Sequence, residues 1–329
     1  MRSYLFRRLI YAFIAIWAVS IVSFLIIQLP PGDYVSSYIA NLSAQGASIG
    51  ASEAENLRKS YGIDRPLHVQ YLKWISQILR GNLGYSFEWE MPVKQLLGER
   101  LQLTFVLALA SVAFTWIVAI PIGIISAVKQ YSWFDYLATG FGFLGLAVPD
   151  FLLALILLYV SFAWFGMSVG GLFSEQYVVA SWSVGRAIDL LKHLWIPVLI
   201  LGMSGTAQLV RIMRANLLDE LRKPYVVTAR AKGLPEWRLV LKYPVRLALN
   251  PAISLTAYIL PYLVSGSIIV SVVLNLPTVG PILLRALVSE DMFVAGAIIL
   301  MVGSLTVLGT FISDLLLVWV DPRIKFEGR

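Results

Sequence analysis

The run LQLTFVLALASVAFTWIVAIPIGIISAV, residues Leu101–Val128, decides the fold because its 28 residues include no charged side chain. An α-helix rises about 1.5 Å per residue, so about 20 such residues cross the roughly 30 Å hydrocarbon core of a membrane. The whole chain is 58% hydrophobic and only 14% charged, proportions that lie outside those of ordinary soluble domains. The sequence therefore predicts an all-α polytopic membrane protein.

Largely uncharged runs of this kind predict six transmembrane helices. The first follows Arg7 and Arg8, and its 21 residues exceed a signal-peptide core and continue into Leu29-Pro30-Pro31-Gly32, so we expect a retained helix. The third contains Pro149-Asp150 and the fourth is the shortest, so their ends are the least defined. The six runs are Leu9–Leu29, Leu101–Val128, Tyr136–Phe165, Leu194–Val210, Pro251–Val273 and Phe293–Trp319.

The distribution of lysine and arginine predicts the orientation of these helices. With six spans both termini lie on one side, and 16 of the 26 basic residues fall on that side. Because basic residues gather on the cytoplasmic side, both termini are expected to be cytoplasmic. The predicted organisation is an N-terminal helix (1–29), an external segment (30–100) with seven basic and seven acidic residues, a transmembrane domain (101–320) and a cytoplasmic tail (321–329).

Positive charge is concentrated between the fourth and fifth predicted helices. Residues Arg211–Arg246 hold nine basic and three acidic side chains, a net charge of +6 in a chain of net charge +7. The preference for cytoplasmic basic residues explains part of this excess. Nucleic acid is not an expected partner, because the segment lies between spans at a membrane surface.

Within this segment, the stretch YVVTARAKGLPEWRLVL, Tyr225–Leu241, has start and stop signals for two short helices. Pro224 suits the first turn of a helix that runs to about Lys232, and Gly233 can end it in the left-handed conformation. Pro235 then begins a second helix, where Glu236 suits the positive end of the helix dipole. An ordinary loop needs no such punctuation, so the stretch predicts a docking surface for a partner. Pro244 limits the length of the second helix.

The residues that would support catalysis or energy conversion are absent from the sequence. It contains no GxxxxGK[ST] phosphate-binding loop, no GxSxG or HExxH motif and no cysteine, and its two histidines are His68 and His193. We therefore predict a non-enzymatic chain without a metal site or cofactor. Asp150 and Asp314 are the only acidic residues within the predicted spans and lie far apart in sequence, so they do not form a proton relay. We expect structural roles, with Asp150 at a helix break and Asp314 either snorkelling to the end of its helix or paired with a neighbouring base.

Across nearly its full length the chain resembles the inner-membrane permease subunits of binding-protein-dependent ABC importers, specifically the first permease of the dipeptide and oligopeptide group. Thr228-Ala229-Arg230-Ala231-Lys232-Gly233-Leu234 is similar to the EAA-type cytoplasmic motif of that family, although Val227 and Thr228 stand at its acidic and second positions. The other stretches that carry the resemblance are Arg7-Arg8-Leu9, Leu29–Asp33, Arg80–Ser86, Glu99–Thr104, Asp314-Leu315-Leu316 and Asp321–Ile324.

The resemblance implies that the two short helices, at about residues 224–243, are coupling helices that sit in a groove of a cytoplasmic ATPase. ATP and magnesium would be bound by two such ATPase subunits, and the further partners would be a second homologous permease, an external substrate-binding protein and membrane lipid. The expected substrate is a di- or oligopeptide, with oligosaccharides or nickel chelates as alternatives. A self-sufficient secondary transporter is the alternative from another class. The expected ATPase-coupling residues are Thr228, Ala229, Arg230, Ala231, Lys232, Gly233, Leu234, Pro235 and Trp237.

Overall fold

The structure is a computed structural model that describes residues 2–28, 55, 56, 59, 65–86, 88–166 and 170–320, with the backbone alone at 2–5, 165, 255–266, 316–317 and 319–320. The chain divides into two compact units. The larger comprises Met1–Arg8, Leu103–Pro281 and Leu308–Arg329, and the smaller comprises Leu9–Gln102 and Ile282–Val307.

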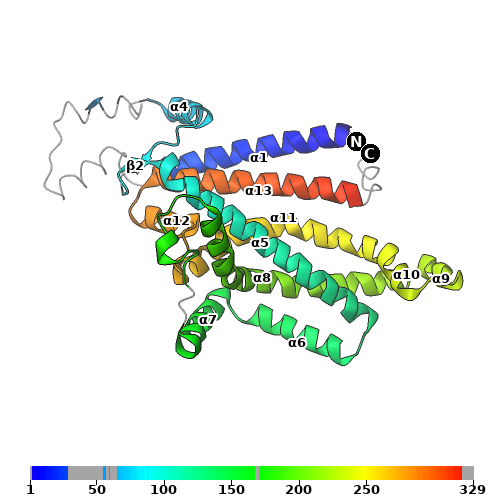
Figure 1. The fold of residues 1–329 in the computed structure, drawn as a ribbon. Coiled ribbons are helices and arrows are strands. Elements are labelled where there is room, and N and C mark those ends of the chain that lie inside the picture. The colour runs from blue at the N-terminus through cyan, green and yellow to red at the C-terminus, as the bar shows by residue number, and fades with distance from the viewer. Residues whose placement is uncertain are drawn as a thin grey trace. The chain divides into compact units, whose positions relative to one another are not determined.

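Helices make up most of the described chain (Figure 1). Its one described sheet is a hairpin of β1 (Tyr85–Ser86) and β2 (Met91–Pro92), in which Tyr85 pairs with Pro92 and Ser86 with Met91. A short 3-10 helix covers Glu175–Tyr177. The α-helices are α1 (Arg2–Gln28), α4 (Leu67–Leu79), α5 (Val93–Val128), α6 (Trp133–Ala147), α7 (Asp150–Phe165), α8 (Val184–Leu221), α9 (Pro224–Ala231), α10 (Glu236–Lys242), α11 (Pro244–Val273), α12 (Val279–Val288) and α13 (Met292–Val320).

Four helices among the described residues are long and apolar enough to cross a membrane, namely α1, α5, α8 and α13. They confirm apolar helices at the first, second, fourth and sixth predicted spans. The fifth predicted span, Pro251–Val273, lies within the 30-residue helix α11. Helix α5 begins at Val93, eight residues before the predicted start of the second span, because Glu99 and Arg100 interrupt an uncharged run without interrupting a helix.

The third predicted span, Tyr136–Phe165, is not one continuous helix. It is broken into α6 and α7, whose axes differ in direction by 101°. Proline has no amide hydrogen and disfavours helical backbone in the residue before it. Val148 accordingly adopts an extended conformation (φ −90°, ψ 121°), and Asp150 becomes the first residue of α7. The break that the sequence indicated therefore divides the span.

The fourth predicted span, Leu194–Val210, is only the middle of a much longer helix. Helix α8 has 38 residues, which correspond to a length of about 57 Å. The basic residues at its two ends stop the count of uncharged residues, but lysine and arginine are good helix formers. As a result, the part of the predicted basic loop from Arg211 to Leu221 is helical and continuous with the span.

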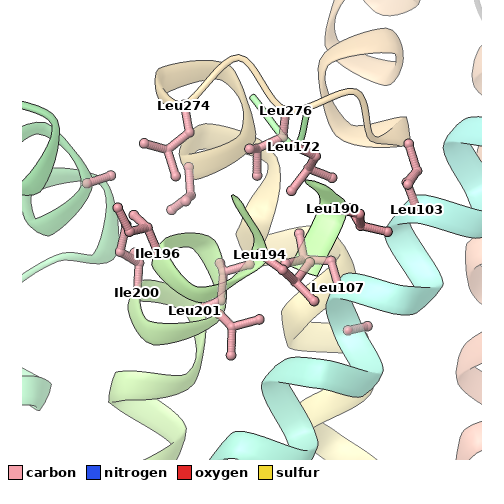
Figure 2. Packing of buried hydrophobic residues seen from close by; sticks show 14 of the residues in the cluster. Leu103, Leu107, Leu172, Leu190, Leu194, Ile196, Ile200, Leu201, Leu274 and Leu276 are labelled. Atoms are coloured by element: carbon pink, nitrogen blue, oxygen red, sulfur yellow. The ribbon is translucent and has the colours of Figure 1, made fainter. Parts of the chain in front are cut away.

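The core of the larger unit joins α5, α8 and the turn that follows α11. Figure 2 shows Leu107 of α5 near Leu194 of α8, and Leu172 beside Leu276. The backbone amide of Gly171 donates to the carbonyl of Leu274 at 2.7 Å, which fixes this turn against the segment before α8. The packing holds α5 and α8 side by side and so positions their opposite ends.

The smaller unit contains the described part of the predicted external segment. Tyr71 and Trp74 of α4 contact Phe24 of α1, and the hydroxyls of Ser20 and Tyr71 lie 2.7 Å apart. Next to the hairpin, Ser86 Oγ donates to the buried carboxylate of Asp291 at 2.6 Å. Most of the segment between Leu29 and Asp64, and the predicted tail 321–329, lie outside the described residues.

Candidate functional site

The predicted pair of short helices is present, and its punctuation is confirmed. Pro224 occupies the first turn of α9, and Pro235 is the residue immediately before α10. Gly233 has a φ of +76°, in the left-handed region. A Cβ at Gly233 would meet no atom within 4 Å, so glycine is needed here for its backbone conformation and not for space. Pro244 does not lie within α10, which ends at Lys242, but begins α11 after the single residue Tyr243.

A hydrogen bond connects the start of α9 to the end of α8. The Tyr225 hydroxyl donates to Glu220 Oε2 at 2.7 Å. Burial, and in second place the Glu220 carboxylate, raises the pKa of Tyr225. The hydroxyl therefore remains a donor throughout the neutral range, and the two helices stay joined at their turn.

One face of the α9–α10 pair is buried against the rest of the larger unit. Val226 and Leu239 are fully buried, and Ala229 and Val240 are nearly so. They pack on residues at the C-terminal ends of α5 and α8 and at the start of α11, including Ala127, Met213, Leu217, Val245 and Ala248. Burial of this apolar area holds the pair in place.

An ion pair connects α9 to α10 across the turn at Gly233. Arg230 donates from Nε to Glu236 Oε2 at 3.0 Å and from Nη2 to Oε1 at 2.5 Å. Hydrogen bonds from Arg230 lower the pKa of Glu236, and the same bonds raise the pKa of Arg230. Both side chains are half exposed, so the pair orients the turn more than it stabilises the fold.

The opposite face of the pair is exposed and also apolar. Val227 and Ala231 lie one turn apart on α9, and Trp237 and Leu241 lie one turn apart on α10. Trp237 is 62% exposed and Leu241 is 53% exposed. The guanidinium of Arg238 lies 4.9 Å from the centre of the Trp237 ring. The outer face therefore combines apolar area with adjacent positive charge.

The structure places two of the expected coupling residues against the chain itself. Ala229 is buried, and Leu234 packs partly against the chain's own cluster. Thr228 Oγ1 donates to the carbonyl of Pro224 at 3.0 Å. The other predicted residues, Arg230, Ala231, Lys232, Gly233, Pro235 and Trp237, are exposed.

The sequence prediction missed three exposed residues, Val227, Leu241 and Tyr243. The spacing of four residues from Val227 to Ala231 and from Trp237 to Leu241 was the signal that would have found the first two. Such pairs lie on one face of a helix.

The two acidic residues within the predicted spans, Asp314 and Asp150, lie where structural roles explain them. Arg8 Nη1 lies 2.8 Å from Asp314 Oδ2, which confirms the predicted pairing of Asp314 with a base. Asp150 is in the first turn of α7, as expected for an acidic residue at a helix break. Among the described residues, no group of three or more histidine, cysteine, aspartate or glutamate side chains could hold a metal ion.

Comparison with known families gives two matches that together cover most of the chain. Residues 119–326 match the model described as "binding-protein-dependent transport system inner membrane component", and residues 1–108 match the model for the N-terminal part of such components. The first match includes the whole α9–α10 pair.

Similar proteins match over their full length. A protein of Brucella suis named as a peptide permease is 34% identical over 329 residues, which cover 99% of both chains. The oligopeptide transport system permease protein AppB of Bacillus subtilis is 32% identical over 99% of this chain and 100% of its own. The inner membrane ABC transporter permease protein YejB of Escherichia coli O157:H7 is 32% identical over 100% of both chains.

Proposed function

Because the chain belongs to the family of binding-protein-dependent transport system inner membrane components, we propose that it is the permease subunit of an ABC importer for di- or oligopeptides. The names of the relatives in Brucella suis and Bacillus subtilis support the choice of peptide. The protein forms half of a translocation pore together with a second, homologous permease. An external binding protein delivers the substrate.

The proposed membrane topology has six spans with both termini in the cytoplasm. The apolar helices α1, α5, α8 and α13 support four of these spans. The bent pair α6–α7 and the 30-residue helix α11 supply the other two. The excess of basic residues between α8 and α11 supports the cytoplasmic placement of α9 and α10.

The α9–α10 pair is the proposed coupling site for a cytoplasmic ATPase. Two such ATPase subunits bind ATP and magnesium in the complex, whereas this chain itself carries no cofactor and catalyses no reaction. The observation that carries the assignment is the exposed apolar face around Trp237 and Leu241, on helices whose other face is buried on α5 and α8. Aromatic and aliphatic side chains beside arginine are typical of interface centres. Closure of the ATPases on ATP would push this surface and change the direction in which the pore opens.

A substitution on the outer face tests this assignment in a reconstituted complex. Trp237→Glu places a charge where an apolar contact is proposed, and the exposed position predicts little effect on folding. We expect loss of ATPase association and of ATP-driven transport. The matched control is Val179→Glu, at a residue that is 94% exposed and precedes the other end of α8. Equal ATPase association in wild type and Trp237→Glu would disprove the assignment.

Two experiments separate the alternatives. A self-sufficient secondary transporter would move substrate when reconstituted alone and would depend on a coupling ion, whereas the proposed permease needs its ATPases. The substrate class is tested by thermal unfolding of the partner binding protein with peptides, oligosaccharides or nickel chelates. A ligand that binds the folded state raises its melting temperature, and a rise with oligosaccharides alone would overturn the peptide assignment.

A further inference from the structure

A buried ionic cluster holds the first turn of α6. Asp135 is 2% exposed, and its carboxylate accepts hydrogen bonds from Arg214 Nε and Nη2, each at 2.7 Å. It also accepts from the hydroxyl of Ser126 and from the backbone amide of Tyr131 at 2.9 Å. The cluster therefore joins α5, the turn after it, α6 and α8 at one carboxylate. A bidentate arginine–carboxylate pair fixes orientation as well as distance.

The same two helices that hold Asp135 also carry the α9–α10 pair. On α5, Ser126 contacts Asp135 while its neighbour Ala127 packs in the cluster under α9 and α10. On α8, Arg214 contacts Asp135 while its neighbour Met213 packs in that cluster. On each helix, therefore, one residue contacts Asp135 and the residue next to it packs under α9 and α10.

Helices α5 and α8 are in close contact at this level. A Cβ added to Gly123 of α5 would lie 2.8 Å from Cβ of Met213. That separation is too short for any side chain larger than hydrogen, so the two helices form one tightly packed base for α9 and α10.

Helix α6 also packs on α8 through small and apolar residues. An added Cβ at Gly142 would lie 4.0 Å from the carbonyl oxygen of Ala207, and one at Gly145 would lie 3.3 Å from Met203 Cγ. Beside these contacts, a partly open apolar pocket of about 410 Å³ lies between α6, α5 and α8. The ionic cluster therefore adds a directional attachment to an interface that these contacts leave apolar.

We propose that Asp135 and Arg214 are positioning residues for transport. They lock α6 to the base formed by α5 and α8, so that α6, and α7 beyond the bend, follow the movement of the α9–α10 pair. Without the lock, only apolar contacts beside the pocket, such as those of Gly142 and Gly145 with α8, would make α6 follow α8 when α9 and α10 are pushed. This inference rests on the proposed function, since it assigns a route for movement that begins at the ATPase contact.

The test replaces both charged residues in the complete complex. Asp135→Leu combined with Arg214→Met keeps the site filled, and exchanging a buried ion pair for apolar residues is often neutral for stability. We expect an assembled complex with the melting temperature of the wild type. Substrate transported per ATP hydrolysed should fall on the order of tenfold, a usual size for a coupling loss.

The matched control is another ion pair of this unit that joins spanning helices, Arg8 with Asp314. Arg8→Met combined with Asp314→Leu removes the same chemistry at residues outside the cluster on which α9 and α10 pack, and the transport ratio should stay at the wild-type value. An equal loss in this control would overturn the proposal, because it would show a general effect of removing charge.

A distance measurement shows whether Asp135 and Arg214 position α6 or only stabilise the fold. The chain has no cysteine, so spin labels can be placed at Phe143→Cys on α6 and Lys232→Cys beside α9, both exposed. With Asp135 and Arg214 present, the distance between the labels should be the same with and without ATP. In the double variant it should change or broaden when ATP binds. An unchanged distance together with an unchanged transport ratio would overturn the proposal.

A milder variant covers the case in which the double variant does not assemble. Arg214→Lys keeps the charge but removes the planar fork of donors, and a partial loss of transport per ATP is expected. A wild-type ratio in this variant, with the complex assembled, would also overturn the proposal. Failure of the proposed function has a different signature, since Trp237→Glu would then leave ATPase association unchanged.

Discussion

Both faces of the α9–α10 pair carry apolar side chains, but the surroundings of the two faces are opposite. Val226 and Val240 lie on the inner face and are buried, whereas their sequence neighbours Val227 and Leu241 lie on the outer face and are exposed. The inner face accounts for the stability of the pair, because α5, α8 and α11 cover it. The apolar outer face is not needed for the stability of this chain. Exposed apolar surface of this kind is typically covered by a partner.

Truncation on the inner face should affect folding. Leu239 is fully buried, and Leu239→Ala is expected to cost about 3 kcal/mol of unfolding free energy through lost contacts and a cavity. Thermal unfolding of the purified complex measures the change. A melting temperature equal to that of the wild type would show that the inner face does not anchor the pair.

Changes at the turn should affect both faces together. Gly233→Ala places a Cβ on left-handed backbone, at an expected cost of about 1–2 kcal/mol. Gly233→Asn should cost less, because asparagine adopts this conformation more readily. Unfolding and transport of the two variants are compared side by side. If asparagine is no better tolerated than alanine, backbone conformation is not the reason for glycine here.

Truncation on the outer face should leave folding intact. Leu241→Ala is expected to change the unfolding free energy by less than about 0.5 kcal/mol, since the residue is exposed. Affinity for the ATPase subunits should fall about tenfold, or about 1.4 kcal/mol. Binding of purified ATPase to the reconstituted permease measures this loss. A marked drop in melting temperature would remove the distinction between the faces.

The smallest expected effect concerns the ion pair between α9 and α10. The pKa of Glu236 lies below its usual 4.5 because Arg230 donates hydrogen bonds to it. A lowered pKa means that the pair stabilises the turn above pH 4.5 and that this contribution is lost as the pH falls through the lower, folded-state pKa. The melting temperature of Glu236→Gln should thus lie slightly below that of the wild type at pH 7, and the difference should vanish in acid. A difference that persists in acid would assign it to another cause.

The local features of this site could be predicted from sequence, but its long-range contacts could not. Glycine and proline act on their own backbone, so the start and end of α9 follow from Pro224 and Gly233. The burial of Ala229 depends on α8 and α5, which no local pattern reveals. The pairing of Asp135 with Arg214 joins residues 79 apart in sequence. In the sequence, neither residue has a local pattern that distinguishes it from other charged residues.

The spans show the same limit. Uncharged runs located the apolar helices, yet counting charges set α5 and α8 too short, because a helix continues past the membrane boundary through Arg100 or Arg211. The break at Pro149 was visible in the sequence. The 101° change of direction was not, because it depends on how α7 packs after the break.

The single residue between α10 and α11 links the movements of the two helices closely. Tyr243 alone separates them, so a rotation of α10 cannot be absorbed by a long, flexible connection. Helix α11 has 30 residues, a length of about 45 Å. A tilt of about 10° at Tyr243 would move its far end by about 8 Å if the whole helix tilted with it, as follows from its length. A small displacement at the proposed ATPase contact would thus become a larger movement at the far end of α11.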